Sequence, residues 1–267
     1  MRALSIFRIL SHTGKYPAQM KFKDYFSEHS ELYAKYRPKY PQKLFEYLSS
    51  ITEQHQRAWD SATGNGQAAV GLTPYFDEVL ATDASKSQIE HAEKHPKVTY
   101  FVAKAEQSNL PSHSVDLIVA ATAIHWFNLP AFYDEVKRIL KPGGVLAAWQ
   151  YSAPIISESV DAVIDYWYTH IIDKFVAPEV RKAIDFESKI EFPFERIQTP
   201  NFDFELNWNL DDLVNFLLTW SCTQSFIKEK NSNPIDIVME DLKKAWGSKD
   251  KRIMSRWKLY LKAAKVG

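Results

Sequence analysis

The chain has 267 residues, of which 33 are basic, 33 are acidic and one is a cysteine, Cys222. This balance of charge provides no overall field that favours nucleic acid or a membrane, so we expect a small-molecule substrate and neither of those partners. A single cysteine excludes an internal disulfide and a cysteine-rich zinc site, and it fits a reducing, cytoplasmic environment.

The first nineteen residues contain Arg2, Arg8 and Lys15, no acidic residue, and a short apolar run. Because that run is short and no small-residue cleavage site follows it, we interpret residues 1–19 as a disordered extension. A targeting segment is the alternative. No stretch of the sequence approaches the length needed to span a bilayer.

Residues 20–50 are predicted to form the helices of a lid, because over residues 25–41 aromatic rings alternate with charges too densely for an ordinary solvated helix. Tyr33 and Arg37 lie four residues apart and therefore share one helical face. The fixed fork of a guanidinium suits a carboxylate, whether of a cofactor or of a substrate. Stacking of Arg37 on Tyr33 or Tyr36 at the surface is the alternative.

Residues 58–67 indicate a strand that stops in a glycine-bearing turn and is followed at once by a helix. Gly64 and Gly66 allow positive φ and a close approach of the backbone to a ligand, while the first N–H groups of the helix stay unpaired. Asp60 lies at the carboxyl end of the strand. A carboxylate there suits an ammonium group and would repel a pyrophosphate.

Short apolar runs then alternate with helical patterns, an order that predicts a parallel sheet. Strands are expected at 78–82, 98–102, 115–121 and 145–150, and helices at 67–73, 86–94 and 131–140, with a Lys-Pro-Gly-Gly turn at 141–144. The carboxyl ends of such strands face one crevice. Asp83 closes the second strand, where it can accept both hydroxyls of a ribose. Capping of the next helix is the alternative, a role that Ser85 can fill.

The fourth predicted strand ends at Ala121 and leads into the run His125-Trp126-Phe127. Small residues there let a ligand approach the backbone, and the aromatic pair would keep water away from a reactive group. His125 can orient a substrate oxygen or accept a proton, since histidine titrates near neutrality. A histidine used only for packing is the alternative.

After the fifth strand, apolar residues follow a three-or-four spacing that predicts a long amphipathic helix over 156–175. A second helix is expected over 211–220, starting at Asp211 or Asn209. Residues 256–264 alternate and are expected to form a last, antiparallel strand. Most aromatic residues of this half are expected in the core, and some in an acceptor pocket.

These motifs resemble those of the class I S-adenosylmethionine-dependent methyltransferases, whose motif I is an acid followed by a Gly-x-Gly turn. Ala62 stands at the first glycine of that motif, so we expect it to have an ordinary φ. The His125-Trp126-Phe127 run resembles the branch that includes trans-aconitate methyltransferase. The resemblance covers most of residues 22–265 and implies an α/β fold: a doubly wound, Rossmann-like, seven-stranded sheet, mostly parallel with an antiparallel last strand, plus a helical cap.

The implied organisation is an extension at 1–19, lid helices at 20–50, a cofactor-binding core at 51–151, a helical cap insertion at 152–195 and a C-terminal completion of sheet and cap at 196–267. The resemblance implies S-adenosyl-L-methionine as the cofactor, held by Tyr33, Asp60, Ala62, Gly64, Gly66, Gln67, Asp83, Ala84, Ala105, Glu106 and Ala121. Lys104 replaces the acid that reads the adenine in the family, so we expect main-chain contacts from Ala105 and Glu106 and a solvated Lys104.

The predicted function is in-line transfer of the methyl group to an oxygen, such as a carboxylate, of a small acceptor, with Arg37, His125 and Trp126 as catalytic residues. No metal is expected, because the eight histidines form no His-Glu-x-x-His motif. Two alternatives stay open. Residues 64–69 also fit the looser Gly-x-Gly-x-x-Gly/Ala fingerprint of an NAD(P)-dependent oxidoreductase. The other is a catalytically silent cofactor-binding protein.

Overall fold

The computed structural model describes residues 35–178, 180–181, 186, 190–248 and 250–267, so the predicted extension at 1–19 and Tyr33 lie outside the described residues. The chain divides into two compact units. The sheet unit consists of Pro38–Ala153, Asp185–Phe204 and Trp257–Gly267, and the helical unit of the described parts of Met1–Arg37, Pro154–Ile184 and Glu205–Arg256. Within the described ranges, every helix is too short or too polar to cross a membrane.

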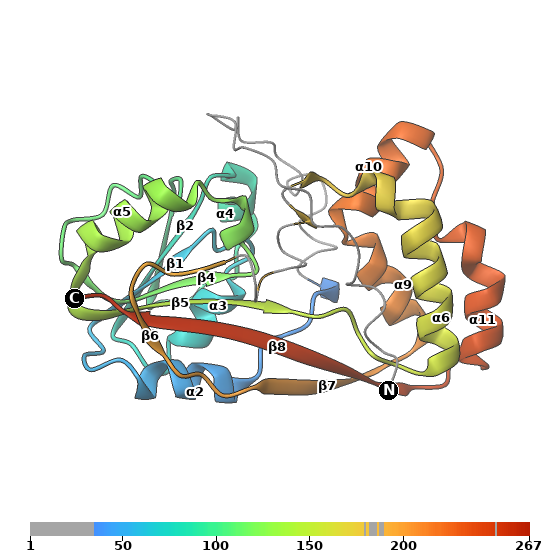
Figure 1. The fold of residues 1–267 in the computed structure, drawn as a ribbon, viewed down its shortest axis with the longest axis horizontal. Coiled ribbons are helices and arrows are strands. Elements are labelled where there is room, and N and C mark those ends of the chain that lie inside the picture. Colours follow the sequence, from blue (N-terminus) through green and yellow to red (C-terminus); the bar gives the residue numbers. More distant parts are fainter. Residues whose placement is uncertain (1–34, 179, 182–185, 187–189, 249) are drawn as a thin grey trace. The chain divides into compact units, whose positions relative to one another are not determined.

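The described strands form one sheet in the order β3-β2-β1-β4-β5-β8-β6, with β7 paired to β8 (Figure 1). They are β1 (Arg57–Ser61), β2 (Glu78–Asp83), β3 (Val98–Val102), β4 (Val115–Ala121), β5 (Leu140–Tyr151), β6 (Glu195–Ile197), β7 (Phe202–Trp208) and β8 (Ile253–Lys265). Strands β1 to β5 are mutually parallel, and β8 is antiparallel to β5 and β6. The predicted α/β class and the antiparallel strand beside β5 are confirmed.

The sheet has eight strands in the described chain, one more than predicted. The segment Phe202–Trp208 alternates buried and exposed residues, as a strand with one covered face does. Sequence reasoning passed over this alternation. The predicted turn at 141–144 lies inside β5, because Val115 pairs with Leu140 and Leu117 already pairs with Val145.

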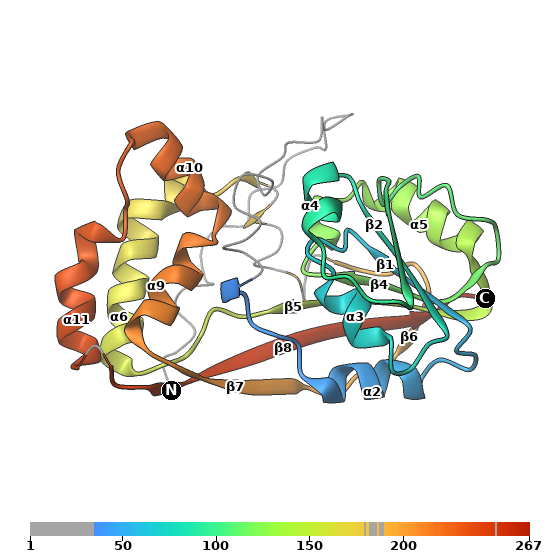
Figure 2. The same cartoon turned by 180° about the vertical axis from the view of Figure 1, so that it is seen from behind.

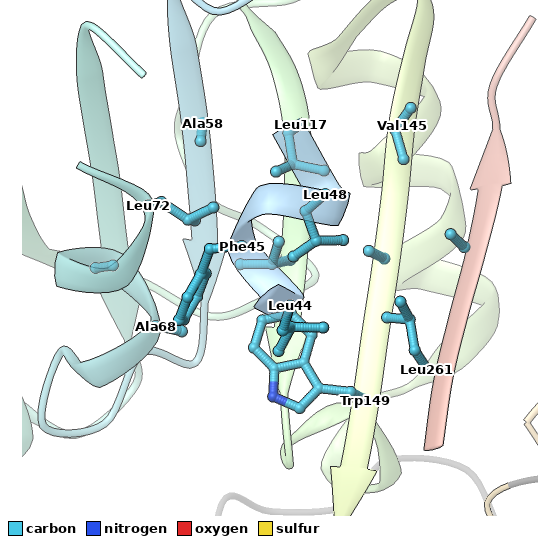
Figure 3. Close-up of a cluster of buried hydrophobic side chains, with 14 of the residues drawn as sticks. Leu44, Phe45, Leu48, Ala58, Ala68, Leu72, Leu117, Val145, Trp149 and Leu261 are labelled. Atoms are coloured by element: carbon cyan, nitrogen blue, oxygen red, sulfur yellow. The ribbon is translucent and has the colours of Figure 1, made fainter. Parts of the chain in front are cut away.

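Helices cover both faces of the sheet, which confirms the doubly wound arrangement (Figures 1 and 2). On one face lie α2 (Gln42–Ser50) and α3 (Gln67–Leu72), and on the other α5 (Leu129–Ile139). The short α4 (Lys86–His91) joins β2 to β3. Figure 3 shows Leu48 of α2 near Leu117 of the sheet and Leu44 near Trp149, all within one buried apolar cluster. Full burial of each such side chain contributes about 1.5–3 kcal/mol, so this apolar contact holds α2 on the sheet.

In the helical unit the predicted long helix is α6 (Glu158–Trp167), which continues through a π-helical turn at Tyr168–Ile172 and a 3₁₀ turn at Asp173–Phe175. Its buried residues Val160, Ile164 and Trp167 keep the predicted spacing. The unit also contains α9 (Leu210–Leu218), α10 (Ser221–Lys230) and α11 (Met239–Trp246). Of the two proposed start signals for α9, Asn209 is the cap: its side chain accepts from the amide N of Asp212, 2.8 Å away.

Candidate functional site

The carboxyl ends of β1, β2 and β4 lie along one edge of the sheet, because β1 pairs in parallel with both of the other strands. The order of the strands reverses between β1 and β4, since β2 and β3 continue on one side and β5 on the other. Ligands of open α/β sheets bind at such a switch point, outside the carboxyl ends of the strands. The residues after these three strands therefore form the candidate site.

The turn after β1 depends on its two glycines. Gly64 and Gly66 have φ values of +55° and +84°, which glycine adopts without the steric cost that other residues incur. A Cβ on Gly66 would also overlap the hydroxyl oxygen of Tyr100, whereas among the described residues a Cβ on Gly64 would meet only Gln88 Oε1, at 3.9 Å. Gly66 is thus required by conformation and by packing, while the described part of the chain leaves space beside Gly64 for a ligand.

Ala62 contradicts the expectation of an ordinary φ, because its φ is +57°. The next residue is fixed to the neighbouring strand, since Thr63 N donates to the carbonyl oxygen of Thr82 at 2.8 Å. The chain must therefore turn at position 62, as it would with the usual glycine. A left-handed conformation costs a residue with a Cβ about 1–2 kcal/mol.

We expect Ala62→Gly to raise the free energy of unfolding by about 0.5–1 kcal/mol, because relief of the left-handed strain outweighs the added entropy of the unfolded chain. Urea denaturation of the ligand-free protein measures the change. Ala58→Gly, a change at a fully buried position of the preceding strand β1, is the control and should destabilise. Equal losses of stability in both variants would contradict the assigned strain.

Asp60 is buried completely at the end of β1. Its Oδ2 accepts a hydrogen bond from Thr63 Oγ1 at 2.5 Å, and its Oδ1 has no partner among the described residues. Burial raises the pKa of Asp60 to about 7; the nearby Asp83 carboxylate adds to this rise, and the Thr63 hydrogen bond opposes it. A cationic ligand group would supply the partner that Oδ1 lacks.

Asp83 follows β2 and holds two backbone amides. Its Oδ2 accepts from Gly64 N at 2.9 Å and its Oδ1 accepts from Ser85 N at 2.8 Å. The side chain therefore links the ends of β1 and β2. The N-cap of α4 is Ser85, whose Oγ accepts from Gln88 N. Capping therefore does not account for Asp83. Ala84, the next residue, is half-buried.

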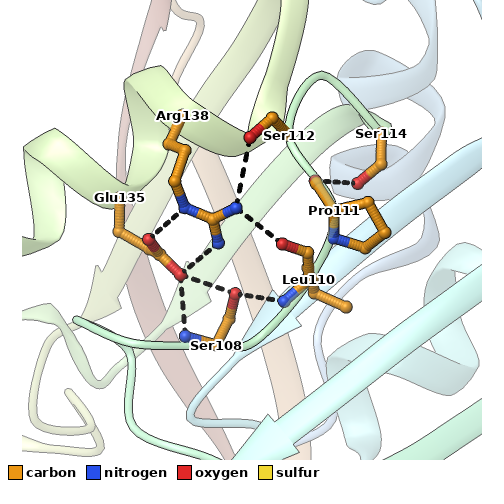
Figure 4. Close-up of polar contacts among 7 residues, drawn as sticks. All are labelled: Ser108, Leu110, Pro111, Ser112, Ser114, Glu135 and Arg138. Atoms are coloured by element: carbon orange, nitrogen blue, oxygen red, sulfur yellow. Dashed lines mark hydrogen bonds and ion pairs between the residues drawn. The ribbon is translucent and has the colours of Figure 1, made fainter.

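The loop after β3 carries Ala105, which is buried, and Glu106, whose Oε1 accepts from Asn128 N at 2.8 Å. Lys104 is exposed, as predicted. Figure 4 shows how the loop is fixed to α5: Glu135 accepts from the amide and the hydroxyl of Ser108, both at 2.7 Å. Arg138 donates twice to the same carboxylate. This network holds the main chain of the predicted adenine-binding loop in place.

The segment after β4 begins with a second left-handed residue, since Thr122 has a φ of +51°. The half-buried Ala121 precedes it. A 3₁₀ turn, Ile124–Trp126, then brings together two of the predicted catalytic residues: His125 is buried, and its ring centroid lies 5.0 Å from that of the half-buried Trp126. A positive φ is a genuine outlier for a β-branched residue, and such outliers cluster at functional sites.

Arg37, the third predicted catalytic residue, belongs to the helical unit. Its Nη2 donates to the carbonyl oxygen of Thr219, the residue that ends α9, at 3.2 Å. The guanidinium carbon lies 5.5 Å from the centroid of the Phe216 ring. Arg37 thus packs on a phenylalanine, whereas the alternative of surface stacking had placed it on Tyr33 or Tyr36.

Gln67, a predicted cofactor-binding residue, opens α3 in the sheet unit and donates from its Nε2 to the carbonyl oxygen of Pro38 at 3.1 Å.

Sequence reasoning missed two residues at this edge. Tyr40 Oη lies 3.2 Å from Thr122 Oγ1 although the two are 82 positions apart. Tyr100 comes from β3 and lies against Gly66, and its hydroxyl donates to the carbonyl oxygen of Glu93 at 2.6 Å. No local motif indicates either contact, because both depend on how the strands pair.

Comparison with known proteins shows that this chain is similar to methyltransferases. The family described as "Methyltransferase domain" matches residues 59–148. A Dictyostelium discoideum protein named as a methyltransferase is 37% identical over 243 residues, which cover 89% of this chain and 92% of that protein. A Saccharomyces cerevisiae protein named as an S-adenosylmethionine-dependent methyltransferase is 25% identical, covering 79% of this chain and 86% of that protein. A solved structure named as a type II methyltransferase from Anaeromyxobacter dehalogenans is 34% identical, with a TM-score of 0.79, and covers 86% of this chain and 98% of that one.

Proposed function

This chain belongs to the S-adenosylmethionine-dependent methyltransferases, and we propose that it transfers the methyl group to an oxygen atom of a small-molecule acceptor. Its cofactor is S-adenosyl-L-methionine. Membership of this family removes the NAD(P)-dependent oxidoreductase alternative.

When bound, S-adenosylmethionine supplies a methyl group on a positively charged sulfur, so that transfer breaks the carbon–sulfur bond, leaves its electron pair on sulfur and forms a carbon–oxygen bond from an oxygen lone pair. The protein has little activation to provide. It must align the acceptor and exclude water, and alignment can contribute up to about 7–11 kcal/mol in ideal intramolecular reactions.

The residues at the carboxyl edge of the sheet fit this cofactor. Asp60 Oδ1 is a buried acceptor without a partner in the described structure, and it suits the ammonium of the methionyl part. Asp83 closes β2, where its carboxylate would accept the ribose hydroxyls, and the described residues leave room beside Gly64. Ala105 and Glu106 lie on the loop that we assign to the adenine.

The observation that carries the choice of oxygen is the buried imidazole of His125 directly after β4, with Trp126 beside it. An imidazole in this position can orient an acceptor oxygen or take the proton of a hydroxyl. A carboxylate needs only orientation, since it has no proton to lose at neutral pH. Arg37 would bind an acidic group of the acceptor or the methionyl carboxylate through its fork.

We expect the double variant Arg37→Ala, His125→Ala to lower kcat/KM at least about 100-fold, since acid–base or orienting groups of this kind typically contribute 10²–10⁴-fold. The assay follows transfer of radiolabelled methyl from S-adenosylmethionine to a panel of carboxylic acids, alcohols and amines. The control is Arg256→Ala with His91→Ala, which removes the same side-chain types from exposed positions. Rates that are equal in both double variants would refute the assigned roles.

Turnover on any member of that panel would also separate an enzyme from a catalytically silent cofactor-binding protein.

We further propose that the protein acts in the cytoplasm. Its single cysteine, Cys222, is buried, and burial raises the pKa of its thiol to about 12, so it stays a packed, unreactive thiol.

A further inference from the structure

We propose that Tyr40 is a positioning residue for methyl transfer: its hydroxyl helps to hold Thr122 in a left-handed conformation and so sets the direction in which the chain leaves β4. The proposal rests on the proposed function, because that part of the chain carries His125 and Trp126. Tyr40 thus acts through another residue and makes no contact with the reacting atoms. All four residues belong to the sheet unit.

Thr122 is the residue at which the chain turns away from the sheet. It follows β4 directly, and its φ is +51°. A left-handed φ is strained for a β-branched residue, so it persists only where neighbouring groups impose it. The 3₁₀ turn Ile124–Trp126 starts two residues later and is closed by a hydrogen bond from Trp126 N to the carbonyl oxygen of Ala123, at 2.9 Å. Rotation about the φ of Thr122 would therefore move the whole turn, with His125 and Trp126 on it.

Three hydrogen bonds hold Thr122 in this conformation. Its N donates to the carbonyl oxygen of Trp149 in β5, and its Oγ1 donates to the carbonyl oxygen of Ala121 in β4, both at 2.8 Å. The third joins Thr122 Oγ1 to Tyr40 Oη, at 3.2 Å. A threonine hydroxyl has one hydrogen, and Ala121 receives it, so Tyr40 is the donor of the third bond. Of the three bonds, the one from Tyr40 comes from outside the sheet.

Packing fixes the position of Tyr40 itself. Its ring packs edge-on against the indole of Trp149, with centroids 5.3 Å apart, and lies 6.5 Å from the ring of Phe45. Two residues earlier, the carbonyl oxygen of Pro38 accepts from Gln67 Nε2 at 3.1 Å. The segment before α2 thus contacts both the start of α3 and the turn after β4. A side chain held in this way can fix the geometry of a neighbouring group.

The reaction makes the position of this turn matter. Transfer requires the acceptor oxygen to lie in line behind the methyl group, and a displacement of roughly 1 Å can lower the rate about 100-fold. Loss of one hydrogen bond out of three should move the turn by less than that. The groups assigned to the cofactor lie mostly after β1, β2 and β3, so we expect kcat to fall and cofactor affinity to change little.

The first test is Tyr40→Phe, which keeps the ring and its packing and removes only the hydroxyl. With an acceptor that is methylated in the panel above, we expect kcat to fall about tenfold and the Kd of S-adenosylhomocysteine to change by less than about twofold. Tyr47→Phe is the matched control. Tyr47 lies in α2, and its hydroxyl also donates to a backbone carbonyl, that of Gln198, at 2.7 Å. A merely structural role of the hydroxyl would give similar kcat values in the two variants.

Thr122→Gly and Thr122→Val separate conformation from direct contact. Both variants remove the hydroxyl, but only glycine adopts a left-handed φ without strain. We expect kcat of the valine variant to be at least about tenfold below that of the glycine variant. In the Thr122→Gly background, Tyr40→Phe should lower kcat by less than about threefold, because the partner of its hydroxyl is already absent.

A third measurement needs no turnover. In protein with ¹⁵N-labelled tryptophan, the indole N–H signal of Trp126 is assigned by its loss in Trp126→Phe. With S-adenosylhomocysteine bound, we expect this signal to shift in Tyr40→Phe, because the turn moves, and to stay fixed in Tyr47→Phe.

Four results would overturn the proposal: an unchanged Trp126 signal in Tyr40→Phe, a loss of S-adenosylhomocysteine affinity as large as the loss of kcat, equal kcat in the two Thr122 variants, or a full effect of Tyr40→Phe in the Thr122→Gly background. The last would mean that the hydroxyl acts directly on the reactants. If no acceptor in the panel is methylated, the proposed function fails, and the Trp126 signal alone decides whether Tyr40 positions the turn.

Discussion

Gly66→Ala should abolish binding of S-adenosylmethionine and lower the free energy of unfolding by roughly 3 kcal/mol, the sum of left-handed strain and overpacking. The strain arises because φ at this position is +84°. The overpacking arises because the new Cβ would overlap the Tyr100 hydroxyl, which is itself hydrogen-bonded to the carbonyl oxygen of Glu93. Urea denaturation and calorimetric titration with S-adenosylhomocysteine measure the two effects.

Gly64→Ala is the matched control, because φ is also positive there but, of the residues that the structure describes, the new Cβ would contact only Gln88, whose Oε1 lies at 3.9 Å. We expect the free energy of unfolding of this variant to fall by only about 1–2 kcal/mol, the cost of the left-handed conformation for alanine. Tyr100→Phe combined with Gly66→Ala should recover part of the loss, since the overlapping oxygen is removed. If the two alanine variants were equally stable, packing by Tyr100 would not be the reason for the glycine.

The stability of the ligand-free protein should fall as the pH rises, because of Asp60. Burial raises the pKa of this carboxyl from 3.8 to about 7, so the folded state holds a proton that the unfolded state releases. The stabilising contribution is fully present below about pH 4 and is lost as the pH rises through about 7, at up to about 1.4 kcal/mol per pH unit. Urea denaturation between pH 4 and pH 8 measures this slope.

Asp60→Asn should remove that slope and make the ligand-free protein more stable than wild type at pH 8. It should also weaken the binding of S-adenosylhomocysteine roughly 10- to 100-fold, because the charge-assisted hydrogen bond to the ammonium is lost. Asp165→Asn is the control. Asp165 Oδ1 is also buried without a partner in the described chain, but this residue belongs to the helical unit. Wild-type affinity in the Asp60 variant would remove Asp60 from the cofactor site.

Local sequence patterns predict much of this fold, because each parallel strand is a short, mostly apolar run with a clear end. Val98–Val102 and Val115–Ala121 have the predicted bounds, and Glu78–Asp83 differs by the residue that closes it. The additional strand, β7, could not be placed in this way. Its alternating pattern identifies a strand with one covered face, but its pairing partner, β8, lies about fifty residues further along the chain.

In the candidate site, too, local spacing predicts some features, whereas contacts between distant parts of the chain could not be predicted. Asp60, Gly64 and Gly66 lie within seven residues, so their spacing alone predicts the turn, while their contacts with the cofactor stay predictions. The prediction for Ala62 was wrong because alanine by itself suggests an ordinary φ. The hydrogen bond from Thr63 N to Thr82 in the neighbouring strand instead requires a left-handed φ at position 62. The contact between Tyr40 and Thr122 joins residues 82 positions apart, which no local pattern contains.

The central claim is that the turn between β1 and α3 binds the amino-acid end of S-adenosylmethionine. Calorimetric titration of the wild-type protein with S-adenosylhomocysteine and, separately, with NADH tests it most directly. The account predicts one molecule of S-adenosylhomocysteine bound per chain, weaker binding in Asp60→Asn, and no heat from NADH. Saturable binding of NADH with none of S-adenosylhomocysteine would contradict it.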